Sequence, residues 1–356
     1  MAKVLMKGNE AIGAAAIKAE CRYYFGYPIT PSSELPEYLS RELPKVDGVF
    51  LQAESETAAI NMLYGAAGAG ARAMTGSSSP GISLKQEGIS YIAGAELPCV
   101  IVNIVRGGPG LGSIQPSQAD YFQATKGGGH GDYRMVVLAP DSIQETVDLV
   151  IEGFDIADQY RNPVMILGDG VIGQMMEPVE FKDPPKRDLP PKDWATTGTK
   201  DSNGRKRVIN SLYIEAEACE QMNLKLQAKY REIQKNEIKF ETFGTEGAEI
   251  ILSAYGITSR VTKNAIKILE KEGIKAGMVR PITLWPFPYK EFEKAAEIDS
   301  VKAFLSIEMS MGQMVEDVRL GVNGKKPVYF YGRAGGVVPE PLEIVEEVKK
   351  ILGGVK

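Results

Sequence analysis

The sequence predicts an α/β protein of two domains joined by a connector. Short apolar segments without polar alternation, such as CVIVNIV at 99–105, alternate with amphipathic stretches. Such strands are typical of a parallel sheet covered by helices on both faces. The length of 356 residues fits about two domains at ~150 residues each. A segment rich in proline and charge, MMEPVEFKDPPKRDLPPKDW (175–194), interrupts the α/β rhythm, which resumes near Gly247.

The first domain is expected over residues 1–175 as an open α/β sandwich. Its expected buried strands are 49–53, 71–75, 99–105, 135–139 and 164–168. Its expected helices are 8–20, 54–70, 80–94 and a segment from 141, where Ser142 and Glu145 have capping-box spacing.

The remaining residues divide into a connector and a second α/β domain. Residues 176–240 are expected to form the proline-rich connector and a helical arm, with helix over 205–237. This helix either grips a partner or packs on its own domain. The second domain is expected over 241–356, with strands at 248–256, 276–284, 301–309 and 326–333, and helices at 258–272, 288–298 and 341–352.

The composition excludes several classes of protein. A formal charge of -5 without a basic run argues against nucleic-acid binding. No apolar run reaches the roughly 18 residues of a membrane span, and the start lacks a secretory signal, so a cytoplasmic protein is expected. Three cysteines without CxxC spacing and a single histidine, His130, leave little material for an iron–sulfur cluster or a zinc site. Any redox chemistry is therefore expected to use a cofactor or another chain.

The segment FGYPITPSSE (25–34) is expected to be stiff around one hydroxyl. Pro28 and Pro31 flank Ile29 and Thr30, and each proline ring fixes its backbone φ angle. Such a turn holds the Thr30 side chain in a defined place.

A glycine-rich loop, 106–132, follows the most apolar strand directly. Parallel sheets place ligands outside the carboxyl ends of their strands, and loops this long are usually functional or disordered. Arg106 has the fork geometry that matches a carboxylate or phosphate. The alternative is a mobile surface loop with a solvated arginine. No nucleotide fingerprint is present, because the strand–helix context of GxGxxG and the GxxxxGK[ST] pattern are both missing.

Two acids stand at a strand-to-helix junction in QAESETAAIN (52–61). Acids are favoured in the first turn of a helix by its dipole, and this role is assigned to Glu54. Glu56 precedes small residues that pack tightly, so its carboxylate is a candidate for burial and for holding a proton. The serines of MTGSSSPGISLKQEGISYIAG (74–94) either cap a helix or bind an anion or polar ring.

The GDG at 168–170 matches the start of the metal motif of thiamine diphosphate enzymes. That motif ends in an Asn pair, and no NN occurs downstream. We therefore interpret Asp169 as a turn residue and expect the diphosphate and its Mg²⁺ to be held elsewhere.

YPITPSSE, the AESE of 53–56 and RGGPG, in this order, resemble the alpha subunit of 2-oxoacid:ferredoxin oxidoreductases. QAESE, SSSPGISLKQEGISY, GGGHGDYR, RPITLWPFP and IEMSMGQM are most similar to the branched-chain (2-ketoisovalerate) subgroup, and the resemblance is nearly full-length. It implies a pyrimidine-type thiamine diphosphate-binding domain over 1–175, followed by a transketolase C-terminal-like domain over 241–356.

The resemblance also implies the reaction and the partners. The family carries out CoA-dependent oxidative decarboxylation of a 2-oxoacid to acyl-CoA and CO2, and passes the electrons to ferredoxin. A separate beta subunit holds the diphosphate and Mg²⁺, and gamma and ferredoxin-like delta subunits complete the complex with iron–sulfur clusters. No metal site is therefore expected in this chain.

The resemblance assigns roles to individual residues of this chain according to their positions in these motifs. Glu56 matches the acid that bonds the aminopyrimidine ring, with Glu54 as its competitor. Thr30 matches the hydroxyl donor to the 2-oxoacid, and Arg106 matches the arginine that pairs with the substrate carboxylate. Pro28 and Ile29 belong to the cofactor-binding loop, which they shape.

Three alternatives stay open from the sequence. The chain could be the 2-oxoglutarate, pyruvate or arylpyruvate member of the same family, or a non-redox thiamine enzyme of the transketolase type. It could also be a scaffolding subunit without a site. Convergence of Thr30, Glu56 and Arg106 on one cleft would argue against the scaffold.

Overall fold

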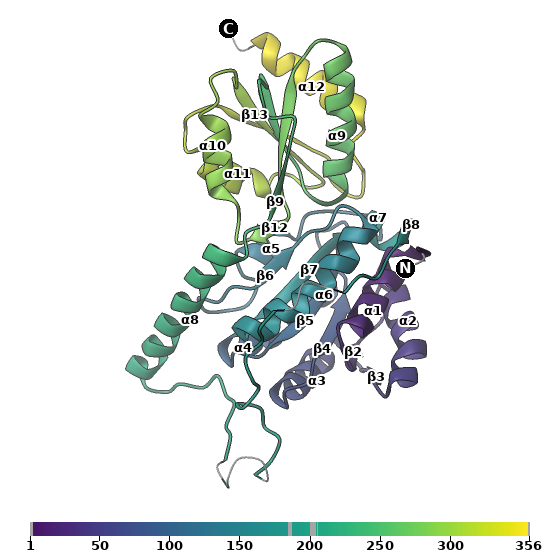
Figure 1. The fold of residues 1–356 in the computed structure, drawn as a ribbon, viewed down its shortest axis with the longest axis vertical. Helices are drawn as coiled ribbons and strands as arrows, with labels where there is room; N and C mark the ends of the chain where they lie inside the picture. The colour runs from purple at the N-terminus through teal and green to yellow at the C-terminus, as the bar shows by residue number, and fades with distance from the viewer. Residues whose placement is uncertain (1–2, 184–186, 200–203, 205, 355–356) are drawn as a thin grey trace.

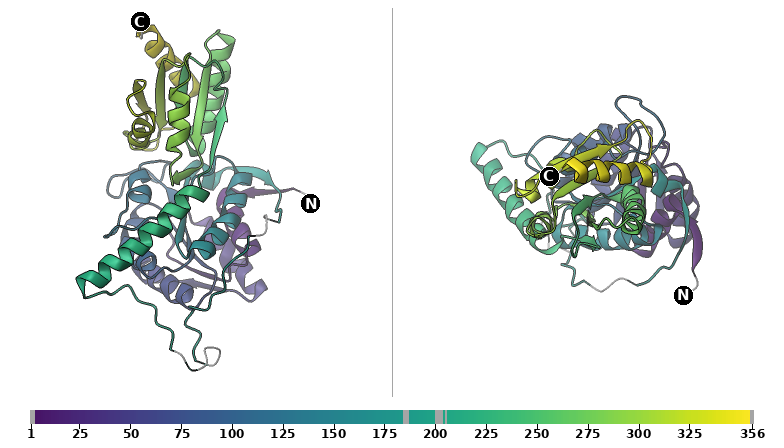
Figure 2. Two further views of the ribbon diagram at one scale, coloured as in Figure 1. Left: turned by 60° about the vertical axis from the view of Figure 1, so that its left-hand side comes forward. Right: turned by 90° about the horizontal axis from the view of Figure 1, so that it is seen from above.

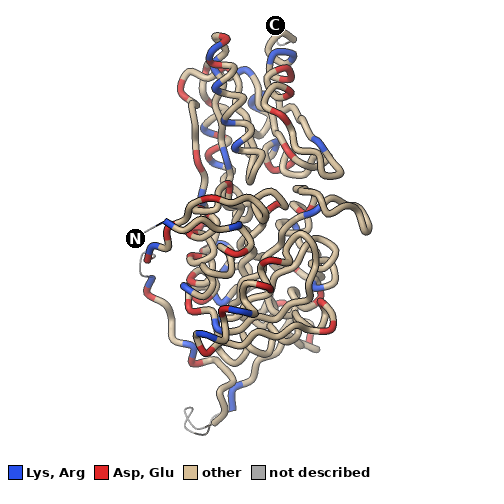
Figure 3. Tube along the Cα trace, turned by 90° about the vertical axis from the view of Figure 1, so that its right-hand side faces the viewer, with Lys and Arg blue, Asp and Glu red and all other residues tan. Residues whose placement is uncertain are grey.

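The computed structural model describes residues 3–183, 187–199, 204 and 206–354. It shows a larger α/β domain that contains the N-terminus and a smaller one stacked on it that ends near the C-terminus (Figure 1). Lys and Arg are interspersed with Asp and Glu along the trace of both domains (Figure 3). Within the described residues, the helices are too short or too polar to span a bilayer.

The first domain is built on a seven-stranded sheet with strand order β12-β6-β7-β5-β4-β2-β3. All neighbouring pairs are parallel except β12 with β6. The strands are β2 (Tyr23–Gly26), β3 (Val49–Gln52), β4 (Ala73–Ser77), β5 (Cys99–Val105), β6 (Val136–Leu138), β7 (Pro163–Asp169) and β12 (Thr283–Trp285). The central strands β4, β5 and β7 are buried along their whole length, as expected for strands of a parallel sheet covered on both faces.

Helices cover both faces of this sheet. Helices α1, α2 and α6 pack together on one face, and α3 and α4 pack on the other (Figure 1). The helices are α1 (Gly8–Lys18), α2 (Glu34–Glu42), α3 (Glu56–Gly68), α4 (Pro80–Gly94), α5 (Tyr121–Thr125), α6 (Ile143–Tyr160) and α7 (Gly170–Gln174), with a 3-10 turn at Leu43–Val46. Gly88 of α4 lets Ile60 of α3 pack against the α4 backbone, because a Cβ there would lie 2.5 Å from Ile60 Cγ2.

The structure departs from the expected elements of the first domain at its margins. Strand β3 forms as predicted but is an edge strand, with Val49 43% and Leu51 39% exposed, so its predicted burial was wrong. Strand β2 and helix α2 had not been predicted. Two further strands, β1 (Val4–Lys7) and β8 (Met176–Val179), pair antiparallel beside α6, so the start of the expected connector packs on the first domain.

The second domain has a five-stranded sheet with strand order β14-β13-β10-β11-β9. Its strands are β9 (Phe240–Phe243), β10 (Ile250–Ser253), β11 (Ala276–Pro281), β13 (Ala303–Glu308) and β14 (Val328–Gly332). Its helices are α9 (Gly256–Lys271), α10 (Tyr289–Ala296), α11 (Met314–Val322) and α12 (Pro341–Gly354). Strand β12, which lies within the range expected for this domain, instead extends the first sheet, because the chain crosses back to pair with β6.

The connector and helix α8 (Ala216–Asn236) run along the outside of the first domain (Figure 2). Helix was predicted from 205, but the described residues 206–215 are not helical, and helix begins only at Ala216. The second half of α8 packs on its own chain through Leu226, Tyr230 and Ile233, whereas its first turns are exposed.

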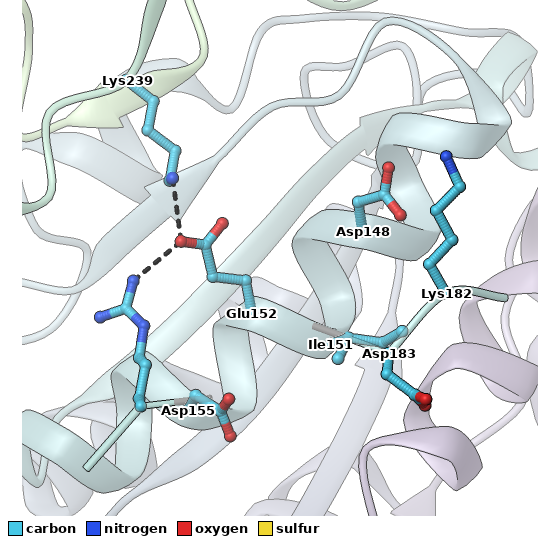
Figure 4. Close-up of a pocket in the computed structure, with 8 residues that line it drawn as sticks. Asp148, Ile151, Glu152, Asp155, Lys182, Asp183 and Lys239 are labelled. Carbon is cyan, nitrogen blue, oxygen red and sulfur yellow. Dashed lines mark hydrogen bonds and ion pairs between the residues drawn. The ribbon is translucent and has the colours of Figure 1, made fainter. Parts of the chain in front are cut away.

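Ion pairs fasten the connector to α6. Arg187 pairs with Glu152 and Glu237, both at 2.8 Å. Lys239 pairs with Glu152 at 2.9 Å (Figure 4). Glu152, Arg187 and Lys239 line a cavity of ≈ 420 Å³, in which the two cations already share the Glu152 carboxylate. These ion pairs hold the connector in place.

Candidate functional site

The candidate site lies where the sheet changes its direction of winding. Strand β2 has β3 on one side and β4 on the other, so the chain reverses between β2 and β4. A crevice outside the carboxyl ends of parallel strands at such a point is the usual place for a ligand. The loops leaving β2, β3, β4 and β5 carry Thr30, Glu56, Ser79 and Arg106, respectively.

Hydrogen bonds fix the loop after β2 at three consecutive carbonyls. The Ile29 carbonyl accepts from the Ser32 hydroxyl at 2.8 Å, and the Pro31 carbonyl accepts from the Asn9 amide at 2.8 Å. The Thr30 carbonyl accepts from Arg106 at 3.0 Å. The Thr30 side chain, in contrast, is exposed and makes no hydrogen bond within the described part of the chain. The loop is therefore held rigidly while its hydroxyl stays free for a ligand.

Arg106 is buried directly after β5, with 7% of its surface exposed. Its Nη1 donates to the Thr30 carbonyl at 3.0 Å and its Nη2 to the Leu111 carbonyl at 3.1 Å. Its Nε is buried and has no partner among the described residues. Arg106 is thus not a solvated surface arginine, and one edge of its guanidinium has hydrogen-bonding capacity left.

Ser79 joins the loop after β4 to the start of the glycine-rich loop. Its hydroxyl donates to Asp120 at 2.7 Å and accepts from the Arg106 N–H at 3.0 Å. Its φ of 23° lies in a region that non-glycine residues rarely occupy, and its own N–H donates to Asn103 at 3.1 Å. Burial raises the pKa of Asp120, although hydrogen bonds from Asn103 and Ser79 act in the opposite direction.

The structure separates the two acids that follow β3. Glu54 is exposed, whereas Glu56, the first residue of α3, is only 7% exposed. Ser55 between them caps α3 by accepting from the Ala58 N–H at 3.1 Å. A Cβ on Gly81 would lie 2.9 Å from Glu56 Oε1 and 2.1 Å from Ser77 Oγ. The absence of a side chain at Gly81 therefore leaves the Glu56 carboxylate room at the start of α4.

Comparisons with known proteins identify the family. The model described as "Pyruvate flavodoxin/ferredoxin oxidoreductase, thiamine diP-bdg" matches residues 14–240, and "Pyruvate:ferredoxin oxidoreductase core domain II" matches residues 248–344. Ketoisovalerate oxidoreductase subunit VorB of Methanothermobacter marburgensis is 49% identical over 353 residues, which is 99% of each chain. The chain belongs to the 2-oxoacid:ferredoxin oxidoreductase family.

More distant family members and solved structures agree. The 2-oxoglutarate synthase subunit KorA of Archaeoglobus fulgidus is 40% identical over 96% of this chain and 98% of its own. The structure of 2-oxoglutarate:ferredoxin oxidoreductase from Magnetococcus marinus superposes with a TM-score of 0.85 at 28% identity, over 98% of this chain and 65% of that one. A split-gene transketolase, at 15% identity and a TM-score of 0.62, shares the fold. The predicted family and fold class are thus confirmed.

The residues of this family member fit one part of thiamine diphosphate. Glu56 presents a buried carboxylate beside the bare backbone of Gly81, and such a carboxylate is the group that can bond the aminopyrimidine ring. Asp169 does not suit a metal. It is buried, caps α7 by accepting from Val171 and Ile172, and also accepts from Ile257 at 3.1 Å. Among the described residues no group of three His, Cys, Asp or Glu side chains could hold a metal ion.

Lys85 of α4 is a residue of this site that the sequence prediction missed. It is fully buried, and its ammonium group has no hydrogen-bond partner among the described residues. Burial lowers its pKa to about 8, while the charge of Glu56 acts to raise it. The signal was present in the sequence, because Lys85 falls four residues after Gly81 and three before Gly88, on the helix face that carries glycines.

A cavity of ≈ 370 Å³ opens beside Arg106 between the two domains. Its first-domain wall consists of Ser79, Asp120 and the 106–110 loop, and its second-domain wall includes Met309 and Gln313. The second domain also holds the glycine-rich loop, since Gln118 donates to the Tyr255 carbonyl at 2.8 Å and accepts from the Met309 N–H at 3.0 Å. Arg106 itself lines this cavity.

Proposed function

We propose that this chain is the alpha subunit of a 2-oxoacid:ferredoxin oxidoreductase that acts on a branched-chain 2-oxoacid. In this reaction the 2-oxoacid and CoA give acyl-CoA and CO2, and two electrons pass to ferredoxin. The name of the VorB relative, ketoisovalerate oxidoreductase subunit, supports the substrate class. The observation that carries the proposal is the hydrogen bond between Arg106 and the loop of Thr30, which places a cation and a free hydroxyl together at the strand ends.

Arg106 and Thr30 bind the substrate in this proposal. The guanidinium pairs with the carboxylate of the 2-oxoacid through its free edge, where burial strengthens a charge-assisted hydrogen bond. The Thr30 hydroxyl donates to the substrate beside it. Because Arg106 Nη1 is bonded to the Thr30 carbonyl, the two groups keep a fixed spacing. Pro28 and Ile29 shape the cofactor side of the same loop.

Glu56 acts on the cofactor. Thiamine diphosphate, when bound, supplies the nucleophilic carbon for attack on the 2-oxo group and accepts the electrons left by decarboxylation. The Glu56 carboxylate accepts a hydrogen bond from the aminopyrimidine nitrogen and so controls the proton on that ring. Glu54 is exposed and has no such role.

Partner subunits complete the enzyme. We propose that a beta subunit holds the diphosphate and Mg²⁺, because Asp169 is already used by backbone N–H groups. Gamma and ferredoxin-like delta subunits carry the iron–sulfur clusters, since the three cysteines of this chain lie apart, two buried and one exposed. The isolated chain should therefore bind thiamine diphosphate weakly and be inactive; full activity of this chain alone would contradict the division of roles.

The test uses the complex purified with its partner subunits and measures CoA-dependent viologen reduction over a panel of 2-oxoacids. Glu56→Gln should lower kcat by ~10²–10⁴-fold, whereas the matched Glu54→Gln should leave it unchanged. Arg106→Lys should raise KM by roughly 10–100-fold, because one charge-assisted hydrogen bond of ~1.5–3 kcal/mol is lost.

The panel also tests the substrate. Turnover should be highest with 3-methyl-2-oxobutanoate. Preference for 2-oxoglutarate would move the chain to the class of its KorA relatives. Near-normal turnover of Glu56→Gln would remove Glu56 from the mechanism.

A further inference from the structure

We propose that Lys85 is a positioning residue for Glu56: its buried ammonium aligns the Glu56 carboxylate, keeps it ionised and so keeps the shared proton on the cofactor ring. This inference rests on the proposed role of Glu56 toward thiamine diphosphate. It adds a charged group inside this chain that acts through Glu56 and touches neither substrate nor cofactor.

The packing of α3 against α4 places the two side chains at one level. Gly81 and Gly88 both face α3, because a Cβ on Gly81 would meet Glu56 and a Cβ on Gly88 would meet Ile60. Lys85 lies between these glycines at the i+4 and i−3 positions, which share one helix face. Side chains on a helix also lean toward its N-terminus, so Lys85 extends toward the turn of Gly81 and hence toward Glu56.

The surroundings of Lys85 do not explain it as a structural residue. Lysines at buried positions are normally paired, or they extend their ammonium to solvent. Lys85 does neither within the described residues, since its relative exposure is 0% and its Nζ has no hydrogen-bond partner. Burying an unpaired ammonium costs stability, so an apolar side chain of similar length would suit this position better. The cost is offset only if the charge is used.

Glu56 is the charged group that acts on Lys85. Burial lowers the pKa of Lys85 to about 8, and the charge of the Glu56 carboxylate acts to raise it. Strand β4, which packs against α3, contributes the buried hydroxyls of Thr75 and Ser77, and these do not titrate in this range. Below pH 8 Lys85 is therefore cationic, and a neighbouring cation favours the ionised form of a carboxyl.

The effect of Lys85 follows from where the proton between Glu56 and the ring nitrogen is held. An ionised Glu56 can only accept a hydrogen bond, so the proton between Glu56 and the ring nitrogen stays on the ring. Without the charge of Lys85, the ionised form of Glu56 loses the favourable interaction with a neighbouring cation. The carboxyl then no longer favours the protonated ring, and proton removal from the reactive carbon slows.

The experiment compares Lys85→Met with the matched variant Lys229→Met in the complex assembled with its partners. Lys229 on α8 is half-buried, and burial lowers its pKa to about 8, but unlike Lys85 it bonds a carboxylate, that of Glu96, at 3.3 Å. Hydrogen–deuterium exchange at the reactive carbon of bound thiamine diphosphate is followed by NMR after acid quench, from pH 5 to pH 9. Lys85→Met should move the acid limb of the exchange rate upward by about one pH unit or more. Lys229→Met should superpose on the wild type.

A second measurement on the full-length chain alone separates a functional lysine from a structural one. Lys85→Met should raise the melting temperature at pH 7, because it removes a buried, unpaired ammonium. Lys229→Met should lower it, because Glu96 and the Arg161 carbonyl lose a donor.

Each combination of results either supports or overturns the proposal. A shifted acid limb together with a raised melting temperature supports the proposal. An unshifted limb in Lys85→Met, while Glu56→Gln abolishes exchange, overturns the role of Lys85 and leaves the proposed function intact. Undiminished exchange in Glu56→Gln overturns both. A lowered melting temperature in Lys85→Met shows a packing residue and also overturns the proposal.

Discussion

Glu308 at the end of β13 offers the sharpest test of how the second domain supports the site. Its carboxylate is fully buried and accepts five hydrogen bonds. Oε2 accepts from the Ser310 hydroxyl and from the N–H groups of Gln313 and Met314, at 2.8–3.0 Å. Oε1 accepts from the Ser306 hydroxyl at 3.1 Å and the Val315 N–H at 2.8 Å. Glu308 thus satisfies the start of α11 and the 310–313 turn beside the interdomain cavity.

Glu308→Gln keeps the shape and removes one acceptor and the charge. An amide nitrogen at the Oε1 position faces the Val315 N–H, and at the Oε2 position it faces two backbone N–H groups. At least one buried N–H therefore loses its partner, which costs ~1–3 kcal/mol. Loss of a negative charge at a partly buried helix N-terminus adds up to ~2 kcal/mol. The free energy of unfolding should fall by about 1–5 kcal/mol.

Calorimetry of the full-length chain measures this change. A loss of that size corresponds to a fall in melting temperature of roughly 4–20 °C in the transition of the second domain, at ~4 °C per kcal/mol for a domain of about 100 residues. The matched control is Glu316→Gln, which makes the same chemical change on the exposed face of α11 and should stay within ~0.5 kcal/mol of the wild type. Equal melting temperatures for Glu308→Gln and Glu316→Gln would refute the reasoning.

Two further predictions concern the first domain. Gly81→Ala should weaken thiamine diphosphate binding by the complex, measured by titration, because the added Cβ crowds Ser77 and Glu56. Gly65→Ala on α3 has open space at its Cβ, so it should leave binding unchanged and stabilise the folded chain by ~0.5–1 kcal/mol. Asp120→Asn should raise the melting temperature at pH 7, and by less toward pH 4. Burial raises the Asp120 pKa, so the protonated carboxyl stabilises the folded state at acid pH, and this contribution is lost as the pH rises through the folded-state pKa. A gain independent of pH would contradict this assignment.

The elements that were predicted correctly are those whose apolar pattern depends only on the local strand or helix and not on a distant partner. The buried strand at 99–105 and the helix at 80–94 were placed at the residues where β5 and α4 lie. Both lie at the centre of the first domain, where burial on all sides favours apolar residues and so gives a pattern that can be recognised in the sequence. Edge strand β3 was placed correctly but taken as buried, because an apolar run does not reveal whether a neighbouring strand exists.

Elements that depend on distant pairing could not be predicted. Strand β12 joins a sheet whose other strands lie more than a hundred residues earlier in the chain, and three residues carry no recognisable strand pattern. Helix was predicted from 205, but the described residues 206–215 form a non-helical segment on which the apolar side chains of Val208, Leu212 and Ile214 are exposed.

Within the candidate site, the sequence led to Thr30, Glu56 and Arg106 through their motifs. In the structure Arg106 directly follows β5, and Thr30 and Glu56 lie four residues after β2 and β3, so the parallel sheet brings their loops to one edge. The difference in burial between Glu56 and Glu54 could be seen only from the packing of α3 on α4. The contact of Asp120 with Ser79 could be seen only from the fold of the loop, and the place of Lys85 only from the helix register.

The second domain explains how a glycine-rich loop can serve a site that demands fixed geometry. Glycines give the 106–112 segment its close approaches but no packing of its own. The loop is instead held further along, where the Tyr121 hydroxyl donates to Asp317 at 2.6 Å and Gln118 bonds the backbone of Met309 and Tyr255. Asp317 follows directly in α11, the helix whose start Glu308 satisfies. The position of Arg106 therefore depends on both domains, because the contacts that hold its loop come from the second domain.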